Sequence, residues 1–247
     1  MKTKHLISGL ALAIAVAPAA AAQKPKPPKP TGPPAPATPI TPPNTPPNKP
    51  PNTPPAITLS AKPTTVIFSG ATVLSGRLSG RTAAGVVVRL EQDTTRPYGD
   101  KYRPSGRTAT TAQNGTYSLT VKPRANTQYR VVASTSPPVT SPAKLVLVRI
   151  RVGIRVSDNT PRRGSRVRFS GSAFPAHDGR RVQIQKRAPS GRFITVARTR
   201  LRDAGNARST YSRRVRVYRD GVYRVKVFND GDHINGFSRL KTIDVHG

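Results

Sequence analysis

The chain has 247 residues, with 42 Lys and Arg against 10 Asp and Glu, a formal net charge of +32, 27 prolines and no cysteine. The lack of cysteine excludes a disulfide framework, a thiolate metal site and a cysteine nucleophile. A single glutamate, Glu91, leaves little material for catalysis by paired carboxylates, whereas so large a positive charge favours polyanionic partners.

Residues 1–22 have the features of a secretory signal peptide. Lys2 and Lys4 precede an apolar run from Leu6 to Ala17, and Ala20–Ala22 supplies the small residues of a cleavage site. The apolar run is short for about 30 Å of hydrocarbon, so we expect cleavage rather than a transmembrane anchor. The mature protein is therefore expected to be secreted, extracellular or associated with the cell wall.

Residues 23–55 form a proline-rich segment, with 16 prolines among 33 residues and a repeated Thr-Pro-Pro-Asn motif that begins at Thr41 and Thr45. Proline fixes φ and has no N–H to donate, so the segment cannot join a helix or a sheet. We expect a disordered spacer of polyproline-II character. A docking motif for an aromatic groove is the alternative interpretation.

Residues 56–247 contain an internal duplication. Four segments recur at an offset of 94 residues and one at 97: 57–60 with 154–157, 70–76 with 164–171, 85–90 with 179–184, 117–121 with 211–215, and 129–131 with 223–225. A repeat of this length is the size of one small domain. The sequence thus predicts two domains, over 56–148 and 149–247, joined near residues 148–151 without a long linker.

Each copy alternates apolar and polar residues over short stretches, which is typical of β-strands. Val167 and Phe169, for example, alternate with Arg166 and Arg168. Turn dipeptides such as Asn-Gly and Asp-Gly separate these stretches, and no apolar period of 3.6 residues is evident. The pattern predicts an all-β fold made of antiparallel sandwiches.

The segment from Asp220 to Val225 resembles the tyrosine-corner segment of immunoglobulin-like domains, with Tyr223 as the corner tyrosine and Val225 where antibody domains have a cysteine. Together with the segment from Asn114 to Val121, it resembles the cysteine-free bacterial Ig-like domains of exported proteins. The resemblance implies two tandem Ig-like sandwiches, with the Tyr223 hydroxyl bonded to nearby backbone. Such domains serve as stalks, adhesion modules or carbohydrate-binding accessory units.

No catalytic, cofactor or metal site is predicted. His177 and His233 are expected to be exposed in turns and His246 at the C-terminal end, and no Gly-x-Ser-x-Gly motif accompanies them. Asp230 and Asp232 lie in a stretch that partly resembles a calcium loop, but apolar residues fall at positions where ligands are needed. A loop between two strands is the preferred interpretation of this stretch.

The positive charge is concentrated in the second copy. Residues 149–247 have 24 Lys and Arg against 7 acids, a net +17, whereas residues 56–148 have 12 against 3, a net +9. Two sets are expected to face outward and to bind a polyanion: Arg155, Arg166, Arg168, Arg214 and Arg216 on one sheet, and Arg181, Arg187, Arg224 and Lys226 on the other. The planar guanidinium suits phosphate and carboxylate. The alternative is a basic composition that only keeps the domain soluble.

These observations predict a non-catalytic exported protein of the cell envelope or its surroundings, structural or adhesive, whose basic surface contacts an anionic cell-wall or extracellular polysaccharide. Two alternatives remain. One is an accessory, polysaccharide-binding part of a secreted hydrolase system that acts on the wall, and the other is binding of extracellular nucleic acid.

Overall fold

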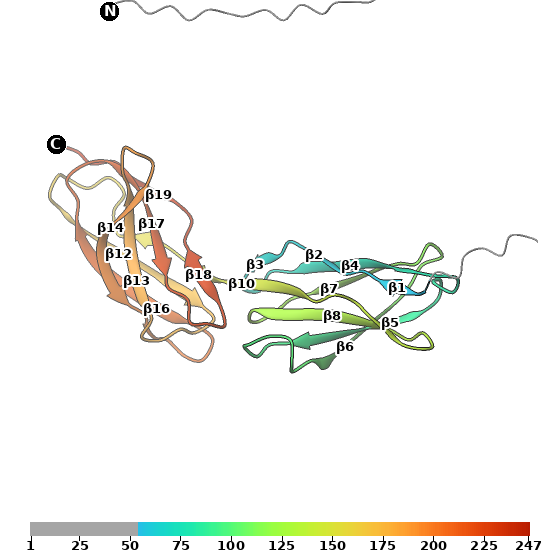
Figure 1. Cartoon of the computed structure of the whole chain (residues 1–247). Helices are drawn as coiled ribbons and strands as arrows, with labels where there is room; N and C mark the ends of the chain where they lie inside the picture. The colour runs from blue at the N-terminus through green and yellow to red at the C-terminus, as the bar shows by residue number, and fades with distance from the viewer. Residues whose placement is uncertain (1–53) are drawn as a thin grey trace, which may run out of the picture. The chain divides into compact units, whose positions relative to one another are not determined.

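The computed structural model describes residues 54–247. All regular structure in this part of the chain consists of β-strands (Figure 1), which confirms the predicted all-β class. Residues 54–247 contain no helix suited to spanning a lipid bilayer. The predicted signal peptide, and the spacer as far as residue 53, lie outside the described residues.

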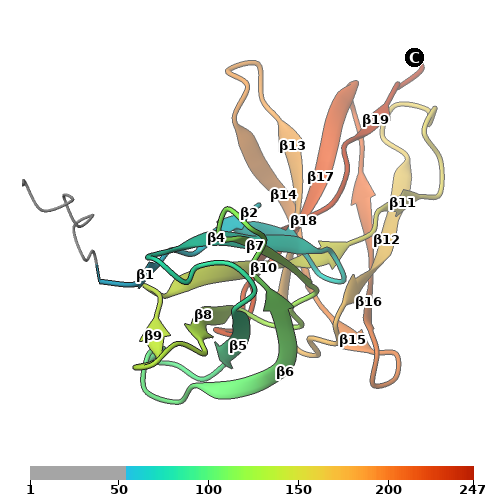
Figure 2. The same ribbon diagram turned by 90° about the vertical axis from the view of Figure 1, so that its right-hand side faces the viewer.

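The first half of the described chain, residues 54–148, is a sandwich of two sheets. One sheet contains β1 (Ala56–Ile57), β2 (Ser60–Lys62), β4 (Thr72–Ser79) and β7 (Thr116–Val121). The other contains β6 (Arg103–Thr110), β5 (Val87–Asp93), β8 (Thr127–Ala133), β9 (Val139–Thr140), β10 (Lys144–Val152) and β3 (Thr65–Ile67). Figure 2 shows β4 and β7 in one layer and β5, β6 and β8 in the other. Their inward side chains form the first core.

The second half, residues 149–247, repeats this plan. One sheet contains the end of β10 with β11 (Arg155–Val156), β12 (Arg166–Phe174), β16 (Ser209–Arg216) and β15 (Arg202–Asp203). The facing sheet contains β14 (Phe193–Arg200), β13 (Arg181–Arg187), β17 (Gly221–Val227), β18 (Ile234–Phe237) and β19 (Lys241–Ile243). This strand order is that of an immunoglobulin-like sandwich, in which strands A, B, E and D face strands C, F and G.

Strand β10 belongs to both halves. Its residues from Lys144 to Arg149 pair with β8 and β3, and its residues from Arg149 to Val152 pair with β18 and β12. The strand therefore runs without a break through the expected connection at residues 148–151. The buried apolar residues form two clusters, and along β10 Val148 belongs to the first and Ile150 to the second. The domain boundaries themselves stay a prediction.

The alternation expected in β12 is present. Val167 and Phe169 are buried while Arg166 and Arg168 are exposed, as expected when alternate residues of a strand share a face. Phe169 packs against the Tyr223 ring of the facing sheet, with ring centroids 5.2 Å apart. Because apolar residues occupy every second position of β12, the arginines between them lie on the outer face.

The prediction for Tyr223 is right about burial and wrong about its hydrogen bond. Tyr223 is 3% exposed, yet its hydroxyl has no backbone partner within the part of the chain that the structure describes. A neighbouring carboxylate makes the bond to backbone at the turn before β17: Asp220 Oδ1 accepts a hydrogen bond from the Val245 N–H at 2.6 Å. The Tyr223 ring instead lies beneath the Lys186 ammonium, 5.6 Å from the ring centroid.

In each half, one other tyrosine donates a hydrogen bond from its hydroxyl to a backbone carbonyl. Tyr117 of β7 donates to the Thr58 carbonyl, and Tyr211 of β16 donates to the Gly153 carbonyl at 2.7 Å. Tyr117 and Tyr211 are one of the matched pairs of the duplication. The repeat in the sequence is therefore also a repeat of a side-chain-to-backbone hydrogen bond.

Candidate anion-binding face

The nine predicted polyanion-binding residues lie on the two outer faces of the second half. Seven are exposed: Arg155, Arg166, Arg168, Arg181, Arg187, Arg214 and Arg216. Arg224 and Lys226, also predicted to face outward, alternate with buried neighbours as expected but are half-buried. Their side chains lie against phenylalanine rings, which shield them from solvent.

Four of the exposed arginines face one another in pairs. Arg166 of β12 lies opposite Arg216 of β16, and Arg168 lies opposite Arg214. We call these four residues the arginine ladder. Opposite residues on one face have Cβ atoms about 5 Å apart, and like charges there are destabilising. No carboxylate within residues 54–247 forms an ion pair with the ladder, so an anion bound between the pairs would relieve their repulsion.

The face continues from the ladder into polar side chains. Because alternate residues share a face, the next two rungs are pairs of hydroxyl side chains, Ser170 with Ser212 and Ser172 with Thr210. The flanking strands add one arginine each. Arg155 of β11 lies opposite Ser170, and Arg202 of β15 lies opposite Thr210. Hydrogen-bond donors thus extend along the whole face.

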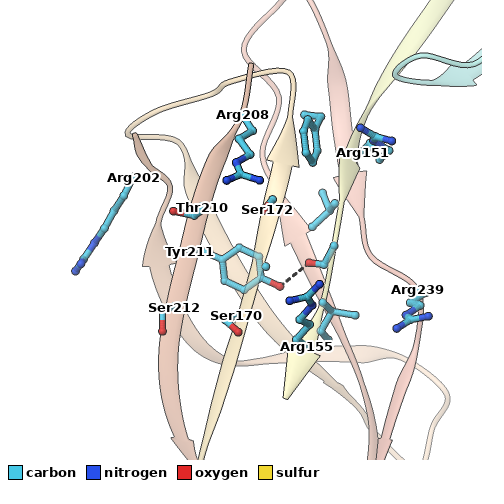
Figure 3. Close-up of a pocket in the computed structure, with 15 residues that line it drawn as sticks. Arg151, Arg155, Ser170, Ser172, Arg202, Arg208, Thr210, Tyr211, Ser212 and Arg239 are labelled. Carbon is cyan, nitrogen blue, oxygen red and sulfur yellow. Dashed lines mark hydrogen bonds between the residues drawn. The ribbon is translucent and has the colours of Figure 1, made fainter. Parts of the chain in front are cut away.

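An open pocket of about 890 Å³ lies at the hydroxyl end of this face (Figure 3). Its lining includes no Asp or Glu and five arginines, Arg151, Arg155, Arg202, Arg208 and Arg239, which define the arginine pocket. In Figure 3, Arg208 is directed toward the hydroxyl side chains, whereas Arg202 points away from them. Guanidinium and hydroxyl donors together suit phosphate, sulfate or carboxylate groups.

Glycine contributes to the hollow. Gly153 occupies the register position between Arg151 and Arg155, where its N–H donates to the Ser172 carbonyl at 2.8 Å. A position without a side chain, opposite a small serine, leaves space between two arginines on the same face. The chain therefore forms a depression flanked by cations.

The outer face of the other sheet combines cations with aromatic rings. The Arg224 guanidinium carbon lies 3.8 Å from the Phe193 ring centroid and 4.6 Å from that of Phe237, and Lys226 Nζ lies 4.5 Å from that of Phe228. We call these five residues the basic aromatic face. Burial lowers the pKa of Arg224. Each contact holds a cation in place and covers part of a ring, so this face offers fewer free donors than the arginine ladder.

Sequence reasoning did not single out the phenylalanines or the loop arginines. The position of Phe193 could have been predicted. One alternating stretch ends at Arg187 and the next begins at Phe193, and a hairpin between them makes the two residues register partners. Arg208 lies in a turn and Arg239 in an irregular segment. No local pattern assigns such residues to a face, so only the folded chain brings them to the pocket.

The prediction that His177 and His233 are exposed is wrong. Their side chains are 1% and 8% exposed, and their rings meet edge to face with centroids 4.8 Å apart. The loop after β12 and the loop after β17 bring the two rings together, and Phe68 of the first half lies 6.1 Å from the His233 ring, centroid to centroid. His246 is exposed, as expected.

The stretch compared with a calcium loop uses its oxygens internally. Asp230 Oδ1 accepts hydrogen bonds from the backbone N–H groups of Asp232 at 3.0 Å and His233 at 2.8 Å. Burial by itself would raise the pKa of Asp230, but the imidazoles of His177 and His233 and the His233 N–H outweigh burial and hold that pKa well below its usual range. Asp230 is therefore an anion enclosed by donors and imidazoles.

Comparisons with known proteins identify no family for this chain. No family model matches the chain. No curated protein matches it either. Among solved structures, the chain is similar to bovine butyrophilin, with 10% sequence identity over 77% of this chain and 99% of that chain, at a TM-score of 0.38. A likeness at this TM-score supports no argument about function.

Proposed function

We propose that this chain is a non-catalytic exported module, structural or adhesive, built as a tandem of Ig-like domains, which binds an anionic cell-wall or extracellular polymer. The face formed by the arginine ladder and the arginine pocket is the binding surface. The observation on which the proposal rests is the collection of exposed arginines on one sheet face, with no acidic residue in the pocket lining. Export rests on the signal-like residues 1–22.

Electrostatics support an extended ligand. Arg166 and Arg168 are two positions apart on one strand, so successive pairs of the ladder are separated by about 6.7 Å. A linear polymer with repeated acidic groups can neutralise both pairs at once, and it can extend to the pocket. Each guanidinium offers paired donors that match phosphate or carboxylate oxygens.

The basic aromatic face does not favour nucleic acid. Base stacking needs an accessible ring face, and Arg224 lies over both Phe193 and Phe237. Recognition through charge alone fits a polysaccharide or polyphosphate at least as well as it fits a nucleic acid. An accessory role beside a wall hydrolase would use the same arginine ladder.

The test is co-sedimentation of the purified protein with isolated cell walls, before and after chemical removal of their anionic polymers. We expect the protein to sediment with intact walls at physiological salt and to remain in solution with stripped walls. Heparin and duplex DNA serve as competitors. Equal sedimentation with both wall preparations would refute the proposal, and displacement by DNA at far lower concentrations than by wall polymer would favour nucleic acid.

A further inference from the structure

The two ring nitrogens of the buried His177 side chain face different groups: Nδ1 faces a backbone carbonyl, and Nε2 faces the Asp230 carboxylate. Its Nδ1 lies 2.7 Å from the Pro175 carbonyl oxygen, which can only accept a hydrogen bond. The proton of a neutral His177 ring is therefore on Nδ1, and Nε2 presents a lone pair. Nε2 lies 2.9 Å from Asp230 Oδ2, to which it donates a hydrogen bond only when the ring is protonated.

His233 repeats this arrangement with its nitrogens exchanged. Its Nε2 lies 2.8 Å from the Arg124 carbonyl oxygen, so the proton of the neutral ring is on Nε2. Its Nδ1 lies 3.5 Å from Asp230 Oδ1 and, among the described residues, has no hydrogen-bond partner although it is fully buried. When both rings are neutral, two imidazole lone pairs and one carboxylate thus converge, and only a proton or a metal ion between them can join the three groups.

Buried acceptors that face one another are costly unless a proton or a metal ion lies among them. We propose that His177 Nε2, His233 Nδ1 and the Asp230 carboxylate form a binding site for a divalent transition metal, with Zn²⁺ the best match. Two imidazoles and one carboxylate are ligands that zinc prefers, whereas calcium and magnesium prefer all-oxygen sites. This site is independent of the proposed polymer-binding face.

The distances suit such an ion. Bonds of about 2.0–2.1 Å at tetrahedral angles place neighbouring ligand atoms about 3.3 Å apart. The two imidazole–carboxylate separations are 2.9 and 3.5 Å, and all three ligand groups have atoms within 4.8 Å of one another. The two imidazole–carboxylate separations therefore bracket the tetrahedral value, and the second carboxylate oxygen or a water would be the fourth ligand.

The surroundings resemble the outer shell of a metal site. Metal-binding histidines usually donate their other ring N–H to a carbonyl or carboxylate, which fixes the ring. Both histidines have such a partner here, Pro175 and Arg124. Arg124 belongs to the first half of the chain, and the neighbouring Asn126 N–H donates to the Asp232 carbonyl at 2.8 Å. A bound ion would thus cross-link two loops of the second half and strengthen their contact with the first.

The test is a titration of the untagged full-length protein with Zn²⁺, followed by calorimetry and by thermal unfolding. We expect one equivalent to bind and the Tm to rise by about 5–10 °C when free Zn²⁺ is 100-fold above its Kd. Co²⁺ should give the visible absorption of a four-coordinate nitrogen and oxygen site. Mg²⁺ should leave the Tm unchanged.

Variants locate the ion. His177→Gln and Asp230→Asn should each weaken Zn²⁺ binding at least 10-fold and reduce the Tm rise at the same Zn²⁺ concentration by about half or more, whereas the exposed His246→Gln should behave like the wild type. Each variant is first melted without metal, and His233→Gln replaces any that does not fold. Absence of a one-equivalent Zn²⁺ or Co²⁺ complex in the wild type would overturn the proposal, as would full retention of binding in a folded His177→Gln variant.

Discussion

The Tyr211 hydroxyl donates a hydrogen bond of 2.7 Å to the carbonyl of Gly153, a residue 58 positions earlier in the chain. The bond passes above Gly171, where a Cβ atom would lie 2.2 Å from the Gly153 oxygen and 2.8 Å from the Tyr211 hydroxyl. Gly76 has the same relationship to Thr58 and Tyr117 in the first half. Each copy therefore requires glycine at this position, Gly76 or Gly171, because a backbone carbonyl lies where a Cβ atom would be.

Replacing Tyr211 with Phe should lower the free energy of unfolding by about 1 kcal/mol, because one buried hydrogen bond is lost and the Gly153 carbonyl is left without its donor. Urea unfolding followed by circular dichroism measures this change. Tyr223→Phe is the matched control, with an expected change within a few tenths of a kcal/mol. A larger loss for Tyr223→Phe than for Tyr211→Phe would contradict the assignment.

Gly171→Ala should destabilise more strongly, by about 1–3 kcal/mol, because the added methyl group collides with backbone that cannot move without disrupting strand pairing. Gly153→Ala provides the comparison, since its Cβ would meet its nearest atoms at an ordinary 3.6 Å. Equal melting temperatures for the two variants would show that the approach at Gly171 can relax.

The stability of the fold should fall as the pH rises above about 10. Burial raises the pKa of Tyr211 above its ordinary value of 10.0, so the folded state keeps the phenol proton at a pH at which the unfolded chain has lost it. Since the folded state then binds more protons, unfolding becomes easier with increasing pH. Urea unfolding between pH 8 and pH 11 should show a steeper decline for the wild type than for Tyr211→Phe. Parallel declines would be inconsistent with this prediction.

Changing all four residues of the arginine ladder to Gln should weaken polyanion binding and flatten its salt dependence. On duplex DNA each neutralised phosphate contributes about −0.9 to the slope of log K against log salt, so the slope should become shallower by about 2–4. Stability should be unchanged or slightly higher, because like-charge pairs are removed. Filter binding over a range of salt concentrations measures the slope.

The control variant changes four other exposed arginines of the second half to Gln and so removes the same charge: Arg162, Arg163, Arg192 and Arg219. We expect this control to alter the slope by less than half as much. If both sets flatten the slope equally, binding is a property of the overall charge and no single face is responsible.

Arg224→Gln should lower the free energy of unfolding by about 1–2 kcal/mol. The guanidinium is held over two phenylalanine rings and its Nε donates to Gln185 Oε1 at 2.9 Å, so the change removes packing as well as charge. The exposed Arg187→Gln should shift stability by no more than about 0.5 kcal/mol. A neutral result for Arg224→Gln in chemical denaturation would mean that the ring contacts contribute nothing.

Local patterns in the sequence were sufficient to predict the strands. Alternation with a period of two is a property of neighbouring residues, so Val167 and Phe169 could be assigned to the core and Arg166 and Arg168 to the surface without knowledge of their partners. The duplication at an offset of 94 likewise needed only the order of residues. The basic character of the second half followed from counting.

Which residues meet depended on the tertiary structure. His177 and Asp230 are 53 positions apart in the sequence, and their contact results from the packing of two loops whose composition is that of ordinary exposed turns. The choice of Tyr211 rather than Tyr223 as hydroxyl donor depended on which ring reaches a strand carbonyl. The pairing of Arg166 with Arg216 depended on register. Period and composition are local properties, whereas register, loop packing and the burial of a polar side chain are decided by residues far away along the chain.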